Sequence, residues 1–253
     1  MAWKPVDCHA HSTMSDGALD VPELIERVAG RGVRPSVSDH ISRDVTGAVD
    51  SIDAIRHYLD ELDRYDVARG GEFCWHDALW HELPPETVRR FTHRIGSLHS
   101  IRLPGDRLFR VFHRELPDGL TPAVYVEAHV ASLEALTVQM PVDVFAHPTL
   151  VSPSLRELDP HELWSEEHEE RLVQALHAAG IAFEISNRYR PHERIVRRAV
   201  DRGVRLSLGS DGHARAQVAD VAQPLALARS LGVSDDELYD PTRHGSRTGA
   251  FDA

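Results

Sequence analysis

The chain of 253 residues is poor in cysteine and lysine and has no long apolar run. Its two cysteines are too few for the disulfide frameworks that hold small secreted domains together. The start, Met1-Ala-Trp-Lys-Pro-Val-Asp, lacks the apolar core of a signal peptide. No stretch approaches the roughly 20 apolar residues that a membrane helix needs. We therefore expect a cytoplasmic protein that has no membrane partner.

Lysine is nearly absent, because Lys4 is the only lysine among 28 lysines and arginines. A Walker-type phosphate cradle and an internal Schiff base each need a positioned lysine, so the sequence excludes both. The 40 acidic residues outnumber the basic ones and give a formal net charge of −12. Because nucleic acid polymers bind basic surfaces, none is expected as a partner.

Short apolar runs alternate with longer amphipathic stretches, and neither a repeat nor a linker divides the chain. The runs are 33–37, 71–73, 95–98, 142–146, 181–185 and 204–208. Helical patterns lie within 20–30, 50–69, 121–140, 161–179, 191–202 and 216–231. Buried strands that alternate with helices predict an α/β fold with parallel strands. About seven such units in one domain favour a barrel, although periodicity alone leaves an open sheet as an alternative.

Nine residues that can bind metal lie at or just beyond the carboxyl ends of predicted strands, and His9 and His11 follow a first short run that precedes the six above. The nine are His9, His11, Asp16, His40, Glu72, His99, His147, Asp211 and His213. In parallel α/β folds this edge is where sites form, whereas chance would scatter such residues over helices and both strand ends. The nine therefore favour a barrel over an open sheet.

Six imidazoles and three carboxylates exceed the about four ligands of a tetrahedral site and the about six of an octahedral one. The set suits two or three divalent ions that share bridging carboxylates. Ligation by histidine and carboxylate without thiolate indicates zinc, manganese or iron. We expect Cys8 and Cys74 to be buried and inert. Asp7 and Asp39 are expected to orient a neighbouring histidine or to end a strand.

Six short motifs resemble, in the same order, those of the PHP (polymerase and histidinol phosphatase) family of metallo-phosphoesterases. They are Asp7-Cys-His-Ala-His-Ser, Ser38-Asp-His, Gly71-Glu72, Gly96-Ser-Leu-His99, Ala146-His-Pro and Gly209-Ser-Asp-Gly-His213. The resemblance covers roughly Val6 to Val233. It implies a single-domain, distorted (β/α)7 TIM-like barrel over residues 1–240, with a trinuclear metal centre held by the nine residues above. Residues 241–253 are then expected to form a mobile tail.

Two features look more like the histidinol-phosphatase branch of this family than like its other branches. One is the step of 27 residues from Glu72 to His99. The other is Glu184-Ile-Ser-Asn187, which is similar to a Glu-x-Asn strand of that branch, and we place Asn187 behind the ligands with Asp7 and Asp39. The residues that follow, Arg188-Tyr-Arg190-Pro, depart from the pattern.

These residues predict a metal-dependent hydrolase for a phosphate monoester of a small soluble metabolite, with histidinol phosphate as the leading candidate. A metal-activated hydroxide would attack phosphorus, so no protein nucleophile is needed. Residual phosphate charge calls for arginine, and Arg188, Arg190, Arg215 and Arg43 follow the strands at the correct end.

Three alternatives stay open. A more open pocket would favour phosphodiesters or nucleotides. Amide hydrolysis, as in related-looking barrels, usually involves a carboxylated lysine, and Lys4 is in no position to serve. A non-catalytic PHP module is the third, although the ligand set is complete. No pattern bears on the oligomeric state.

Overall fold

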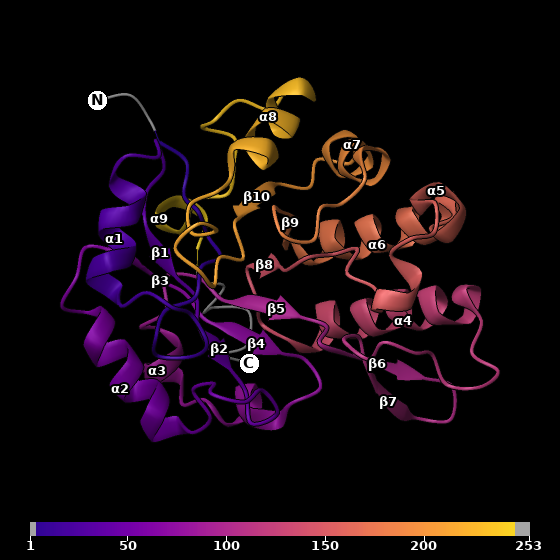
Figure 1. Cartoon of the computed structure of the whole chain (residues 1–253), viewed down its shortest axis with the longest axis horizontal. Coiled ribbons are helices and arrows are strands. Elements are labelled where there is room, and N and C mark those ends of the chain that lie inside the picture. Colours follow the sequence, from indigo (N-terminus) through magenta and orange to yellow (C-terminus); the bar gives the residue numbers. More distant parts are fainter. Residues whose placement is uncertain (1–3, 246–253) are drawn as a thin grey trace.

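The computed structural model describes residues 4–245, and its centre is a parallel sheet of six strands (Figure 1). In spatial order the strands are β10 (Leu206–Gly209), β9 (Ala182–Ser186), β8 (Val144–Phe145), β5 (Ile95–Ser97), β4 (Glu72–Cys74) and β2 (His40–Ile41). All five pairings between neighbours are parallel. The predicted α/β fold with parallel strands is confirmed.

The amino-terminal segment lies between the two edges of this sheet. Parallel bridges join Asp7 to Leu208 on one side and Val6 to Arg34 on the other. Beside Arg34, β1 (Ser36–Val37) pairs with β3 (Ala68–Arg69), and each strand leads after two residues into β2 or β4. Residues 4–245 thus form a TIM-like arrangement with no continuous closed sheet, because isolated bridges replace the ladders next to the first segment.

Helices surround the strands on the outside (Figure 1). They are α1 (Val21–Ala29), α2 (Ile52–Leu62), α3 (Pro85–Val88), α4 (Pro122–Gln139), α5 (Pro160–Leu163), α6 (Glu166–Ala179), α7 (Glu193–Asp201), α8 (Ala222–Ser230) and α9 (Pro241–His244), with 3-10 turns η1 (Ala78–Glu82) and η2 (Pro153–Leu155). α1 begins where expected, because Asp20 and Glu23 form a reciprocal capping box there. Within residues 4–245, no helix is both long and apolar enough to span a membrane.

An antiparallel hairpin after β5 was not predicted from the sequence. β6 (Ser100–Leu103) and β7 (Arg107–Arg110) pair through a tight turn in which Gly105 and Asp106 have positive φ angles of 78° and 63°. The arginines on its exposed face leave too few apolar residues for a clear alternating pattern. The hairpin follows His99 directly and therefore rises from the edge where the predicted ligands lie.

The predicted tail at 241–253 needs a correction in its first part. Residues 241–244 form α9, whose start is capped by the Asp240 carboxylate, an acceptor from the backbone N–H of Thr242. Asp240 also pairs with Arg34, so the end of the described chain is tied to the strand region. Residues 246–253 lie outside the described residues, and the expectation for them stays a prediction.

Candidate metal centre

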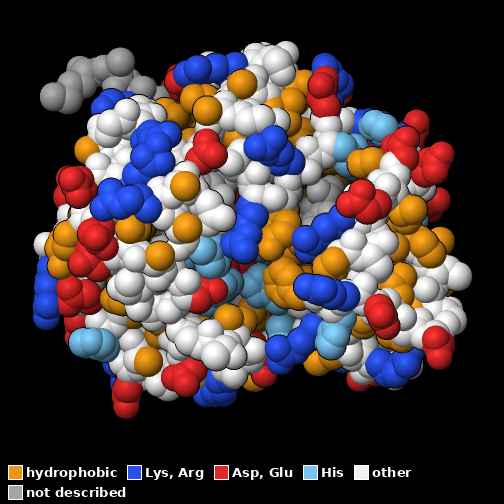
Figure 2. All heavy atoms as spheres, in the orientation of Figure 1, with side chains coloured by type: hydrophobic (Ala, Val, Ile, Leu, Met, Phe, Trp, Pro, Cys, Tyr) orange, Lys and Arg blue, Asp and Glu red, His pale blue; other side chains and the backbone are white. Residues whose placement is uncertain are grey.

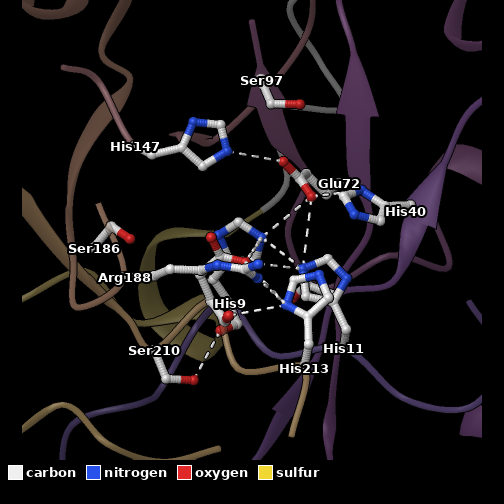
Figure 3. Close-up of polar contacts among 12 residues, drawn as sticks. His9, His11, His40, Glu72, Ser97, His147, Ser186, Arg188, Ser210 and His213 are labelled. Carbon is white, nitrogen blue, oxygen red and sulfur yellow. Dashed lines mark hydrogen bonds and ion pairs between the residues drawn. The ribbon is translucent and has the colours of Figure 1, made fainter. Parts of the chain in front are cut away.

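All nine predicted ligands lie in one cluster, and Figure 3 labels six of them, His9, His11, His40, Glu72, His147 and His213. Eight of them form three overlapping groups whose potential ligand atoms lie within 4.8 Å of one another: His11, Asp16, His40 and His213; His9, His11 and Asp211; and His40, Glu72 and His99. The ninth, His147, places Nε2 at 3.2 Å from Oε1 of Glu72. The structure brings the nine together as the barrel prediction requires.

Glu72, at the start of β4, is the centre of the cluster. Its Oε2 lies 2.7 Å from Nδ1 of His40 and 3.3 Å from Nε2 of His9. Its Oε1 lies 3.1 Å from Nε2 of His99 and 3.2 Å from Nε2 of His147. One carboxylate therefore faces imidazoles from four separate segments of the chain.

Several polar atoms in the cluster are buried without a hydrogen bond. They are Oε2 of Glu72, Nδ1 of His11 and Nδ1 of His40. The Glu72 and His40 atoms approach to 2.7 Å without hydrogen-bond geometry. Buried polar groups are normally satisfied, so several unpaired nitrogen and oxygen donors that converge fit bound cations.

Burial and neighbouring charge set the protonation states of these ligands. Burial, together with the nearby His40, lowers the pKa of His11 to about 3, which leaves that imidazole neutral and able to ligate. Burial alone would raise the pKa of Glu72, but the charges of His40 and His99 hold it well below its usual value. The pKa of Asp211 is likewise held below its usual value, against the effect of burial, by His11 and His9. The carboxylates are therefore ionised near neutral pH.

Glu184 on β9 orients two of the histidines. Its Oε1 accepts a hydrogen bond from Nδ1 of His9 at 2.7 Å, and its Oε2 accepts one from the backbone N–H of His147 at 2.5 Å. A histidine that donates one ring N–H to a carboxylate presents its other nitrogen as a ligand. We did not predict Glu184 as a site residue, although the segment Glu184-Ile-Ser-Asn187, which resembles a strand of the histidinol-phosphatase branch, was the available signal.

The two cysteines are buried, as predicted. Cys8 Sγ contacts the carbonyl of Val6 at 3.8 Å, and burial raises the pKa of this thiol, which fits the inert cysteine expected from the sequence. Cys74 is placed differently, because its Sγ lies 3.0 Å from Nδ1 of His99. It thus contacts the ring of a predicted ligand on the side away from Glu72, a contact that the sequence did not indicate.

The Asp39 side chain supports a loop, and its backbone carbonyl accepts from the backbone N–H of Glu72 at 2.9 Å. The side chain accepts hydrogen bonds from the backbone N–H and the hydroxyl of Ser12, at 2.7 and 2.6 Å, and from the hydroxyl of Ser15 at 2.5 Å. Burial raises its pKa to about 6, although these hydrogen bonds oppose the change. Asp39 thus fixes the turn that carries Asp16.

Asp7 has the same role on the other side of the first segment. It accepts from the backbone N–H groups of Ser210 and Ala219, at 2.8 and 3.1 Å, and so fixes the loop after β10. Asn187 donates to Asp220 at 3.1 Å. Asp7 and Asp39 thus fix backbone loops beside the cluster, and Asn187 contacts a side chain.

A cavity of about 340 Å³ opens onto the cluster. Among the four arginines predicted to bind phosphate, Arg188 alone lines it. Its Nη1 lies 2.6 Å from Nδ1 of His213 and 3.7 Å from Oδ1 of Asp211 (Figure 3). Ser100 and Arg110 of the hairpin and Phe112, just after it, also line the cavity, and the sequence revealed none of the three.

The other three predicted arginines do not line this cavity. Arg43 forms a two-point contact with Glu82, at 2.6 Å for each pair of atoms. Arg215 is exposed and lies 3.8 Å from Glu23. Arg190 faces a neighbouring cavity. For Arg43 and Arg215 the reason is that carboxylates outside the cavity attract the guanidinium groups.

No protein-family model matches the chain, and no curated protein matches it by sequence. Among solved structures, the chain is similar to histidinol phosphate phosphatase from Lactococcus lactis subsp. lactis Il1403, complexed with zinc, L-histidinol and phosphate. The TM-score is 0.69 at 15% identity, over 92% of this chain and 95% of that one. The chain is also similar to the structure of a candidate histidinol phosphatase from Listeria monocytogenes. The TM-score is 0.70 at 14% sequence identity, over 86% of this chain and 98% of that one. The chain therefore has the fold of the histidinol phosphatase structures, as the resemblance to the PHP family implied.

Proposed function

We propose that this chain is a metal-dependent phosphatase that hydrolyses a phosphate monoester of a small metabolite. One observation carries the proposal: nine His, Asp and Glu side chains converge on one edge of the sheet, with buried donor atoms that lack hydrogen bonds. Two or three divalent ions, chosen from zinc, manganese and iron, fit this donor set. The fold similarity to a phosphatase complexed with zinc and phosphate supports the same proposal.

The ions, when bound, would lower the pKa of a water molecule and stabilise charge that develops on phosphoryl oxygens. The chain itself supplies the frame for this chemistry. Glu184 fixes the ring of His9 and the backbone of His147. Asp39 fixes the turn before Asp16. Arg188 lies on the cavity wall, where its guanidinium can donate two parallel hydrogen bonds to a phosphate.

The structure disfavours the amide-hydrolase alternative. That chemistry usually uses a carboxylated lysine between two ions, and Lys4 is the only lysine. Lys4 is exposed and precedes the first segment, whereas His9 and His11 follow along the same segment towards the cluster. A lysine at the amino end of the strands cannot reach ligands at the carboxyl end.

The test is a reconstitution of the metal-free protein with zinc, manganese or iron, followed by assays on a panel of phosphate monoesters and diesters. Histidinol phosphate belongs in the panel. Wild type is compared with His9→Ala and Asp211→Ala, and metal content is measured for each protein. The matched control is His57→Ala, because His57 is exposed on α2.

We expect two or three ions per wild-type chain and monoester hydrolysis that falls at least about 100-fold in both site variants. His57→Ala should behave as wild type. Equal turnover in wild type and both site variants would overturn the proposal, as would preferential turnover of diesters.

A further inference from the structure

A second cavity, of about 480 Å³, adjoins the cavity over the metal centre. The two cavities share Arg188 and Tyr189 as lining residues. The second one is also lined by Arg156, Arg190 and His192. Within residues 4–245, no aspartate or glutamate lines it. Its charged lining is therefore basic in a chain whose net charge is −12.

Tyr189 forms the partition between the two cavities. Its ring lies between two guanidinium groups, with Arg156 at 5.3 Å and Arg188 at 5.4 Å from the ring centroid. The same ring meets that of His147 edge-on, with centroids 5.5 Å apart. The second cavity thus begins one aromatic ring away from a predicted metal ligand, within reach of a small substrate.

The arginines of the second cavity are held by neutral acceptors. Nε of Arg156 donates to the carbonyl of Val151 at 3.2 Å. Arg190 donates to the carbonyl and the side-chain oxygen of Asn187, at 3.1 and 3.3 Å. In the described part of the chain, neither guanidinium has a carboxylate within 4.0 Å.

Several other arginines of the described chain pair with acids instead. Arg171 contacts Glu127 and Glu134, and Arg229 contacts Asp235 at 2.7 Å. An arginine that is positioned by carbonyl groups keeps its full charge and several N–H donors for an anion. In Figure 2, Lys and Arg side chains gather round the hollow in which the histidines are visible.

We propose that the second cavity is an anion subsite for the leaving group of the substrate. A carboxylate or second phosphate of the substrate binds Arg156 and Arg190, while the phosphate to be cleaved lies at the metal centre beside Arg188. The inference rests on the proposed phosphatase function and narrows its substrate class to acidic phosphate esters. An amino alcohol ester such as histidinol phosphate would place a cation against these arginines. Three residues that line the second cavity, Arg188, Tyr189 and Arg190, form the segment that departs from the histidinol-phosphatase pattern.

The test compares four esters with the same carbon chain: butyl phosphate, 4-aminobutyl phosphate, 4-(phosphonooxy)butanoate and butane-1,4-diyl bisphosphate. We expect kcat/KM for the better of the two acidic esters to exceed that for butyl phosphate by at least about tenfold, the effect of one charge-assisted contact. 4-Aminobutyl phosphate should be the poorest substrate. The acidic ester with the larger kcat/KM shows whether carboxylate or phosphate is the preferred group.

The variant Arg156→Gln and the double variant Arg156→Gln/Arg190→Gln should lower this preference, the double variant to less than about threefold. The matched control is Arg229→Gln, because Arg229 pairs with Asp235 and does not line the second cavity. This variant should keep the preference for acidic esters. Equal kcat/KM for acidic and neutral esters in wild type would overturn the proposal. An unchanged preference in the double variant would overturn it as well.

A binding measurement separates this proposal from the phosphatase proposal. Calorimetry with butylphosphonate and butane-1,4-diphosphonate, neither of which can be hydrolysed, is run on wild type and the double variant. If no ester is cleaved but only wild type prefers the diphosphonate, the subsite stands and the phosphatase function fails. If esters are cleaved with no preference for acidic ones, the phosphatase function stands and the subsite fails.

Discussion

Two buried glutamates, each surrounded by basic side chains, differ in how their oxygens are partnered. Glu169 on α6 accepts hydrogen bonds from His192 at 2.6 Å, from Arg194 at 2.7 to 3.0 Å and from Arg198 at 3.4 Å. Glu72 has imidazoles at similar distances, but its Oε2 has no hydrogen bond.

The difference separates a structural charge from a ligand. Arginines are obligate donors, so those around Glu169 satisfy it fully and join α6 to α7. A neutral imidazole donates from only one nitrogen, so His9, whose Nδ1 donates to Glu184, cannot also donate from Nε2 to Glu72 unless it is protonated. The Glu169 region is complete as it stands, whereas the Glu72 region keeps a buried carboxylate oxygen without a hydrogen bond and fits added cations.

The largest effect is expected from Glu72→Gln. The amide keeps the shape of the side chain but removes the charge that holds the cations, so hydrolysis should fall at least about 1,000-fold and metal content should fall with it. The metal-free variant should stay folded, because the amide keeps the shape of the side chain and the histidines beside it can lose their protons. If this variant kept the activity and the metal content of wild type, Glu72 would not differ from Glu169 in binding cations.

Glu184→Gln should have the next largest effect. The amide oxygen can still accept from His9, but the NH₂ group cannot accept from the backbone N–H of His147. Affinity for the ions should fall about 10- to 100-fold, as is typical when a carboxylate behind a metal-bound histidine is altered. Titration of metal-free protein with zinc measures this. An unchanged affinity would show that Glu184 does not position the ligands.

Glu169→Gln is the counterpart of Glu72→Gln and should have the opposite pattern. It leaves Arg194 and Arg198 without their shared carboxylate, and both arginines are partly exposed, at 29% and 25%. We therefore expect a loss of about 2 kcal/mol in the free energy of unfolding, below the usual cost of breaking a fully buried pair. Activity and metal content should stay as in wild type. Denaturant unfolding and metal analysis of the same sample check both statements.

A smaller, pH-dependent effect should accompany that loss. Although burial would raise it, hydrogen bonds from His192 and Arg194 lower the pKa of Glu169 from 4.5 to about 2. Because the folded-state pKa is depressed, the stabilisation is complete above pH 4.5 and is lost as the pH falls towards 2. The stability difference between wild type and Glu169→Gln should therefore shrink over this range. A difference that is constant from pH 7 to pH 3 would contradict the assignment.

The sequence predicted the part of the site that depends on strand ends. A residue such as His40 or His147 directly follows an apolar run, and parallel strands bring such positions to one edge whatever the details of packing. The nine convergent side chains were therefore predictable, and their binding of metal stays a prediction. The α/β fold followed from the same alternation.

The parts that were missed depend on which way a side chain points or on an irregular insertion. Glu184 lies inside a strand that is buried along its whole length, so no alternation marks its inward face. Arg110 and Phe112 belong to a hairpin region that has no clear period. Arg43 was placed correctly along the chain, but Glu82, distant in sequence, attracts its side chain away from the cavity.

The most direct test of the account is anomalous diffraction from crystals of the protein grown with manganese or zinc. The account predicts two or three peaks at the carboxyl edge of the sheet, with Glu72 between them and ligand atoms at about 2.0 to 2.3 Å. Crystals in which the nine side chains hold no anomalous peak, with all their polar atoms hydrogen-bonded to one another, would contradict it.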